Sequence, residues 1–171
     1  DGSTITDLGG RVFTCQGCLN YLGAGLERWS GALTLPGESS PAFQAASVAG
    51  SNVVGSVTRD GVAWNYGYTN LQPNSQSPGS YLYSRLTITG PQAFNTVYDI
   101  ETTDFRNVIW KITDSIGRAT LVDFNDTYQL ERITYPEGNS VSVVYDGFGN
   151  ITSRTSQPKA GAGLSPVTET A

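Results

Sequence analysis

Histidine and methionine are both absent from this 171-residue sequence, and charged residues make up only 15% of it. Without histidine the chain lacks the commonest general base and metal ligand of proteins, so the usual Ser–His or Cys–His arrangements are excluded. A carboxylate pair is the remaining hydrolytic option. However, each candidate carboxylate is better explained as a turn residue or as an exposed strand position. Asp side chains at turns commonly accept hydrogen bonds from their own backbone. We therefore expect no catalytic residue and no cofactor. The carboxylates that could have formed such a pair are Asp99, Glu101, Asp104, Asp114, Asp123, Asp126, Glu131 and Asp146.

A basic patch and a long apolar run are also missing. The net charge is -5 and the ten Lys and Arg residues are scattered, whereas nucleic-acid binding needs clustered positive charge. No apolar stretch approaches the roughly 18–20 residues that span a bilayer as a helix. Because the chain has no initiator Met and no signal peptide, we expect a processed product or a fragment of a longer polypeptide. Nucleic-acid and membrane-spanning roles are set aside.

The cysteine content is limited to one C-x-x-C motif, Cys15 and Cys18. Such a motif can be redox-active, half of a zinc site, or a local disulfide. A zinc site would need a second Cys or His pair, which the sequence lacks, and a redox motif would need a strand-to-helix junction. We favour a structural disulfide, which implies an oxidising compartment, and keep free thiols and redox activity as alternatives.

Calcium is the second metal for which the sequence contains candidate ligands. Asp123, Asn125 and Asp126 form a short oxygen-rich turn, and hard cations prefer such ligands. No EF-hand or other dense acidic spacing is present. Turn chemistry is the favoured explanation, and we expect no metal site.

What the chain does have is turn residues and aromatics: 20 Gly, 8 Pro, 9 Tyr, 6 Phe and 3 Trp. Short alternating segments between Gly, Pro, Asn and Asp are typical of an all-β domain of antiparallel neighbours. Strands are predicted at 56–59, 62–68, 81–89 and 94–101, with a polar loop over 69–80. Only 41–49 suggests a short helical turn.

One aromatic row alternates along a single predicted strand, at Trp64, Tyr66 and Tyr68. If exposed, the row could stack on sugar rings and form a carbohydrate- or receptor-binding platform. Packing of aromatics across strands is the interpretation that we favour.

An internal repeat of 21 residues occupies the last third of the chain. Residues 112–125 align without a gap on 133–146, so that Ile112 falls on Ile133, Gly117 on Gly138 and Phe124 on Tyr145. Each unit has a strand, a turn built round a glycine, a second strand ending in an aromatic, and a second turn. Stacked hairpins of this kind predict a continuous sheet that needs several units for stability.

The second unit resembles a YD repeat, the unit of Rhs proteins, insecticidal toxin-complex shells and teneurins. The resemblance rests on the turn at 136–138 (Pro-Glu-Gly), on Tyr145-Asp146, and on Gly149-Asn150 followed by Ile-Thr. The preceding unit departs from the pattern with Phe124-Asn125, and 60–68 is a weaker echo. The resemblance implies a strip of hairpins, which in full-length relatives curls into a hollow shell or makes an adhesion scaffold. No Asp-Pro pair and no self-cleavage segment is visible.

We therefore predict an all-β strip of tandem antiparallel hairpins with a less regular N-terminal part. Its parts are a Gly-rich β segment (1–55), degenerate YD-like hairpins (56–111), two repeats of 21 residues (112–156) and a linker or tail (157–171), the last of which could also begin a further unit. Stability is expected to depend on the turn glycines and repeat aromatics, which are Gly61, Gly117, Gly138, Gly149, Trp110, Phe124 and Tyr145.

The expected function is that of a non-catalytic, bacterial-type structural segment, secreted or at the cell surface. Its partners would be neighbouring repeats of a larger polypeptide or further copies of itself. Two alternatives remain open: a filament subunit assembled through sheet edges, and a glycan- or receptor-binding β module.

Overall fold

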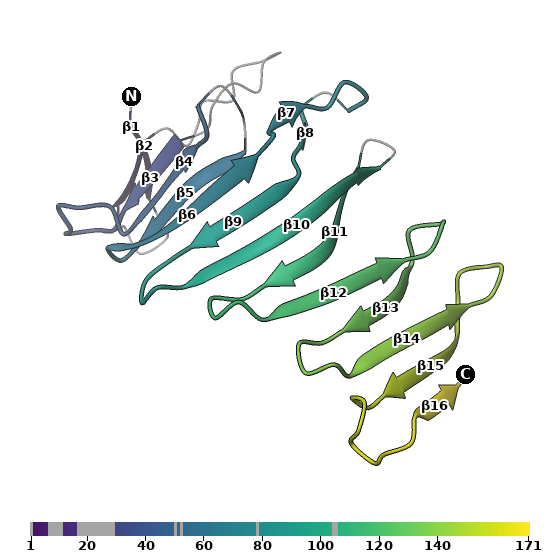
Figure 1. Ribbon diagram of the computed structural model, residues 1–171. Coiled ribbons are helices and arrows are strands. Elements are labelled where there is room, and N and C mark those ends of the chain that lie inside the picture. The colour runs from purple at the N-terminus through teal and green to yellow at the C-terminus, as the bar shows by residue number, and fades with distance from the viewer. Residues whose placement is uncertain are drawn as a thin grey trace.

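The computed structural model describes residues 2–6, 12–16, 30–49, 51, 53–77, 79–103 and 106–171. These residues contain strands and turns and no helix, so none of them forms a helix that could cross a membrane. Fourteen strands form one antiparallel sheet, and nearly every strand pairs with its neighbours in the sequence. Figure 1 shows the resulting single layer as one continuous twisted strip, with the N- and C-termini at opposite ends. The all-β fold of tandem antiparallel hairpins is confirmed.

The sheet consists of strands β1 to β6 and β9 to β16, and β7 and β8 form a separate two-stranded ribbon. Their bounds are β1 Gly2–Thr6, β2 Val12–Gln16, β3 Ser30–Thr34, β4 Phe43–Ser47, β5 Val54–Arg59, β6 Val62–Thr69, β7 Gln72–Pro73, β8 Tyr81–Leu82, β9 Arg85–Thr89, β10 Asn95–Thr103, β11 Arg106–Thr113, β12 Ala119–Phe124, β13 Leu130–Thr134, β14 Ser140–Tyr145, β15 Ile151–Gln157 and β16 Val167–Thr170.

Two local predictions differ from the structure, and at a third segment one of the predicted alternatives agrees with it. The helical turn predicted at 41–49 is wrong, because β4 lies there and pairs with both β3 and β5. The strand predicted at 81–89 is divided, since β8 pairs with β7 in the ribbon while β9 joins β6 and β10 in the main sheet. In the segment 157–171, predicted as a linker, a tail or the start of a further unit, β16 pairs with β15 and extends the sheet, which agrees with the last of these alternatives. Each of these outcomes depends on pairing with a neighbouring strand, which overrides the preference of the segment alone.

Four successive turns in the C-terminal half share one hydrogen-bond pattern. In each, the first residue accepts from the N–H three positions on and donates its own N–H to the carbonyl four positions on, at 2.9–3.1 Å. The fourth residue has a left-handed backbone, which glycine adopts without a steric cost. These fourth residues are Gly117 (φ 83°), Tyr128 (φ 61°), Gly138 (φ 88°) and Gly149 (φ 87°). Turns lie along the two long edges of the sheet, where the strands end. One long edge carries the turns at 114–118 and 135–139, and the other carries those at 125–129 and 146–150.

β-Bulges follow the same 21-residue spacing. The register shifts leave one extra residue on the first strand of each unit, and these residues are Trp110 in β11, Glu131 in β13 and Thr152 in β15. β5 has a bulge of the same kind at Gly55, outside the 21-residue spacing. All four lie near the edge that carries the turns 125–129 and 146–150, which we call the bulge edge. The repeat is therefore a feature of backbone geometry as well as of sequence.

The two faces of the sheet differ in polarity. Residues directly opposite one another lie on the same face, so the register places Tyr68, Leu86, Tyr98 and Ile112 in one row on what we call the apolar face. The other, polar face carries rows such as Thr134, Ser140 and Gln157. Among the described residues the buried apolar side chains are Ala45, Leu82 and Ile100, and no large side chain is fully buried.

Candidate functional site

The aromatic row of β6 is engaged within the protein. Trp64, Tyr66 and Tyr68 alternate on the apolar face and are each half-buried. The Trp64 ring meets Phe94 edge to face, with centroids 5.0 Å apart. A Cβ placed on Gly90 would lie 2.6 Å from the Trp64 ring, so the indole packs directly over that glycine. Trp64 therefore acts as a packing group on this face.

Tyr68 is held by both its ring and its hydroxyl. The ring makes an edge-to-face contact with Tyr83 at 5.0 Å, and the hydroxyl donates to the Val54 carbonyl at 2.9 Å. Burial, and after it the neighbouring Tyr83 and Tyr66, raises the pKa of Tyr68 above its usual value. The geometry of the row is that of cross-strand packing rather than an open sugar platform.

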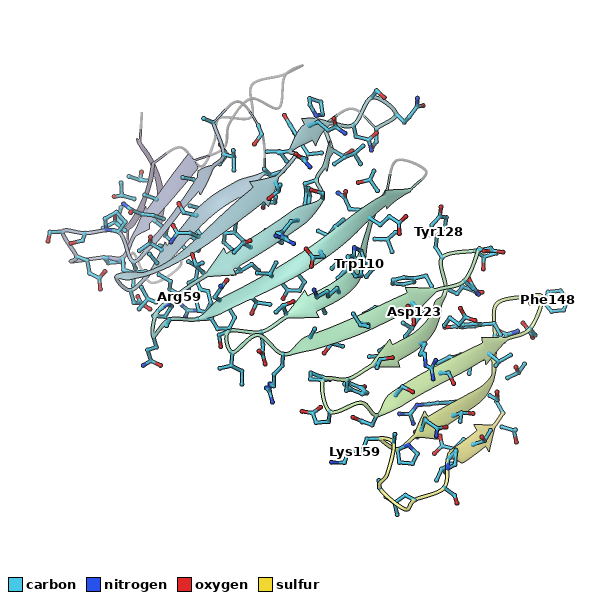
Figure 2. All side chains as sticks on the ribbon, in the orientation of Figure 1. Arg59, Trp110, Asp123, Tyr128, Phe148 and Lys159 are labelled. Carbon is cyan, nitrogen blue, oxygen red and sulfur yellow. The ribbon has the colours of Figure 1, made fainter. Side chains whose placement is uncertain are left out.

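The repeat aromatics have three different environments. The Tyr145 hydroxyl donates to the Leu130 carbonyl at 2.9 Å, which parallels the bond from Tyr68 to Val54. Leu130 and Val54 each directly precede a bulge residue, Glu131 and Gly55 respectively. Phe124, which has no hydroxyl, is half-buried opposite Leu130. Trp110, labelled in Figure 2, is exposed, and the Lys111 ammonium lies 5.9 Å from its ring centroid.

The carboxylates of the repeat turns bind backbone N–H groups. Asp114 and Asp146 each accept from the amides two and four positions on, at 2.8–3.1 Å, and Asn125 does the same with its amide oxygen. The pKa of Asp114 is lowered chiefly by the backbone bond from Arg118, and that of Asp146 chiefly by the Asn150 side chain. Asn125, which the calcium hypothesis required, is thus occupied by its own turn.

Sequence reasoning missed an ion network on the polar face. Asp99 is only 7% exposed and lies directly opposite Arg85 on one side and Lys111 on the other. The Arg85 guanidinium reaches it at 2.6 Å and the Lys111 ammonium at 3.8 Å. Two cations neutralise this buried carboxylate, which serves to join β9, β10 and β11. The alternation of β10 alone does not signal the network, because it depends on pairing across three strands.

The structure also contains a hollow that no sequence motif announced. The loop 158–164 and the polar face border an open hollow of about 490 Å³. Its floor is formed by Thr134, Ser140 and Gln157, which are successive partners across β13, β14 and β15, and Arg132 lies one pleat away on the same face. Lys159 belongs to the loop and is labelled in Figure 2.

A second hollow of about 580 Å³ lies on the bulge edge, between the turns 125–129 and 146–150. Phe148 stands at its margin, is 95% exposed, and projects away from the sheet in Figure 2. Asn125 and Asp146, which also line this hollow, already bind their own turns. This hollow consequently offers few uncommitted polar groups.

The cysteine prediction lies outside the described residues, because Cys18 is not among them and only the backbone of Cys15 is described, in β2. Within the described part of the chain, no cluster of three or more His, Cys, Asp or Glu residues could hold a metal ion. No family model matches the chain, and a comparison with curated proteins finds none with significant similarity.

Proposed function

We propose that the chain is a non-catalytic segment of an extracellular or cell-surface scaffold of the Rhs/YD-repeat type. In such a scaffold, tandem hairpins extend one sheet into a wall or shell. Neighbouring repeats of the same polypeptide would be the first partners of this segment.

The observation that carries the proposal is the single-layer sheet with one apolar face. Protein domains are usually two layers that bury their apolar faces against each other. Here the rows of Tyr68, Leu86, Tyr98 and Ile112 face no second layer within the described residues. A longer strip that curls round would place more of its own apolar face, or enclosed cargo, against these rows. The 21-residue period of turns and bulges supports the same reading, because it permits units to be added in register.

Antibodies raised against the chain would test this proposal in the cells that produce it. The expected result is a polypeptide much longer than this chain, which disappears when intact cells are treated with protease. An intracellular, protease-protected band would contradict the proposal.

A filament assembled through sheet edges is a second candidate function. Among the described residues β16 pairs only with β15, and all four of its side chains are exposed. An outer strand of this kind can accept a further strand. Negative-stain electron microscopy with light scattering separates the two candidates, because long regular fibres would favour the filament and a monodisperse particle the scaffold segment.

A further inference from the structure

We propose that the hollow under the loop 158–164 is a binding site for a small polar oxyanion. The ligand would carry a carboxylate or phosphate group, held by Arg132 and Lys159. This inference goes beyond the scaffold role, because a wall segment needs no such site.

The hollow arises where the chain departs from its own repeat. In the two earlier units the corresponding turns are the tight ones at 114–118 and 135–139. In the third unit the connection between β15 and β16 spans 158–166 and folds back over the polar face. Lys159 approaches the preceding turn so closely that a Cβ on Gly138 would lie 3.8 Å from the Lys159 Cβ. Insertions of this kind in repeat proteins often lie on the binding face.

The ion pairs of the molecule single out this hollow. Seven Lys and Arg side chains are described, and five of them have a carboxylate partner within 4 Å: Arg59, Arg85, Lys111, Arg118 and Arg154. The two described cations without such a partner are Arg132 and Lys159, and both line the hollow.

No carboxylate lines the hollow, although the chain has a net charge of -5. Asp123 lies opposite Arg132 across β12 and β13, but outside the lining and without an ion pair within 4 Å in the described structure. Arg132 and Lys159 are exposed, line the same hollow and have no ion pair within 4 Å among the described residues, and cations placed in this way favour an anion from outside.

Size and lining define the class of ligand further. A volume of about 490 Å³ is in the range of small-molecule sites. The floor of Thr134, Ser140 and Gln157 provides hydroxyl and amide groups, which suit a hydroxylated molecule. In the loop, Gly161 (φ 79°) and Gly163 (φ 67°) flank Ala162, whose N–H donates to the Lys159 carbonyl at 3.2 Å, so the two cations would provide the main contacts to an anion. A sugar acid is the best match to both halves of the site.

Isothermal titration of the full chain with glucuronate, inorganic phosphate and glucose tests the proposal. We expect an anion to bind with a millimolar dissociation constant and glucose to bind far more weakly. Arg132→Gln and Lys159→Gln should each weaken anion binding by about tenfold, the value of one lost charge-assisted bond. Tighter binding of glucuronate would identify a carboxylate-bearing sugar as the source, and tighter binding of phosphate a phosphorylated molecule.

Arg154→Gln is the matched control, because Arg154 is exposed on the opposite face and pairs with Glu169. It should change anion binding by less than about twofold. Failure of both anions to bind at about 50 mM would overturn the proposal, since this is weaker than any useful site. An equal loss in Arg154→Gln and Arg132→Gln would also overturn it, because the effect would then be one of net charge. Circular dichroism of each variant establishes that the sheet is retained.

Discussion

Gly90 occupies a position where the packing of an indole leaves no room for a side chain. A Cβ there would lie 2.6 Å from the Trp64 ring, nearer than side chains approach one another in proteins. We predict that Gly90→Ala lowers the free energy of unfolding by about 1–3 kcal/mol, as overpacking does, and changes the Trp fluorescence.

The Gly90→Ala penalty should depend on Trp64. In a Trp64→Ala background, Gly90→Ala is expected to cost much less, and denaturant unfolding of the four proteins of this cycle measures the coupling. Gly147→Ala is the control, because a Cβ at Gly147 meets no atom within 4 Å. Independence of the two changes at 90 and 64 would contradict the described packing.

The Tyr145 hydroxyl is the second residue-scale feature, because it satisfies the Leu130 carbonyl beside a bulge. Removing one partner of such a bond costs about 1 kcal/mol, so Tyr145→Phe should destabilise the chain by that amount in urea unfolding. Tyr135→Phe is a suitable comparison, since Tyr135 is exposed and its hydroxyl has no bond in the described structure. Equal effects of the two substitutions would argue against the bond.

The hydrogen bonds of the turn aspartates lead us to expect that the fold loses stability in acid. The pKa values of Asp114 and Asp146 are below the usual 3.8, so their stabilisation is fully present above the pKa of the unfolded chain. It is lost as the pH falls through the lower folded values. Because Asn125 makes the same two backbone bonds without a charge, the double variant Asp114→Asn/Asp146→Asn should keep its turns.

Melting temperatures between pH 5 and pH 2 measure this effect. The wild type should lose more of its melting temperature over this range than the double variant, which no longer titrates at these turns. If the two proteins lose the same amount, the turn carboxylates are not the acid-sensitive groups.

At the scale of elements, the repeat unit is a module of fixed length. A copy of residues 133–153 inserted after Ser153 continues each strand and turn in register, so the enlarged protein should fold and melt at or above the original temperature. The same copy without Ser142 would turn half a strand to the opposite face, because side chains alternate. The protein with this shortened copy should have a lower melting temperature. A melting temperature equal to that of the protein with the full copy would contradict a module of fixed length.

Sequence predicted the elements wherever local signals determine them. The glycines at 117, 138 and 149 and the alternation of Trp64, Tyr66 and Tyr68 indicate turns and strands directly. The bulge residues Trp110, Glu131 and Thr152 have no chemistry in common, so only their spacing could have revealed them. The hollow was beyond prediction, because a loop at 158–164 closes over residues of a preceding unit.

At the scale of the whole molecule, each strand packs extensively only against its neighbours in the sheet. Stability should therefore be local rather than shared. In Gly55→Val the new side chain would begin 3.1 Å from the backbone nitrogen of Val48, and we expect a local cost of about 1–3 kcal/mol. Hydrogen exchange should quicken in β4 to β6 and remain unchanged in β13 and β14. A uniform loss of protection along the strip would instead indicate one cooperative unit.

The bulges have a consequence for the shape of any longer strip. A bulge bends its strand and increases the local twist, and here the bulges lie along the same edge. Bends placed on alternate edges would cancel, whereas bends on one edge accumulate. Each additional unit of 21 residues then adds a further bend in the same direction, so that a longer strip follows an arc. The number of repeats in a polypeptide would in this way determine the total curvature of the sheet, and with it whether the two ends of the wall meet.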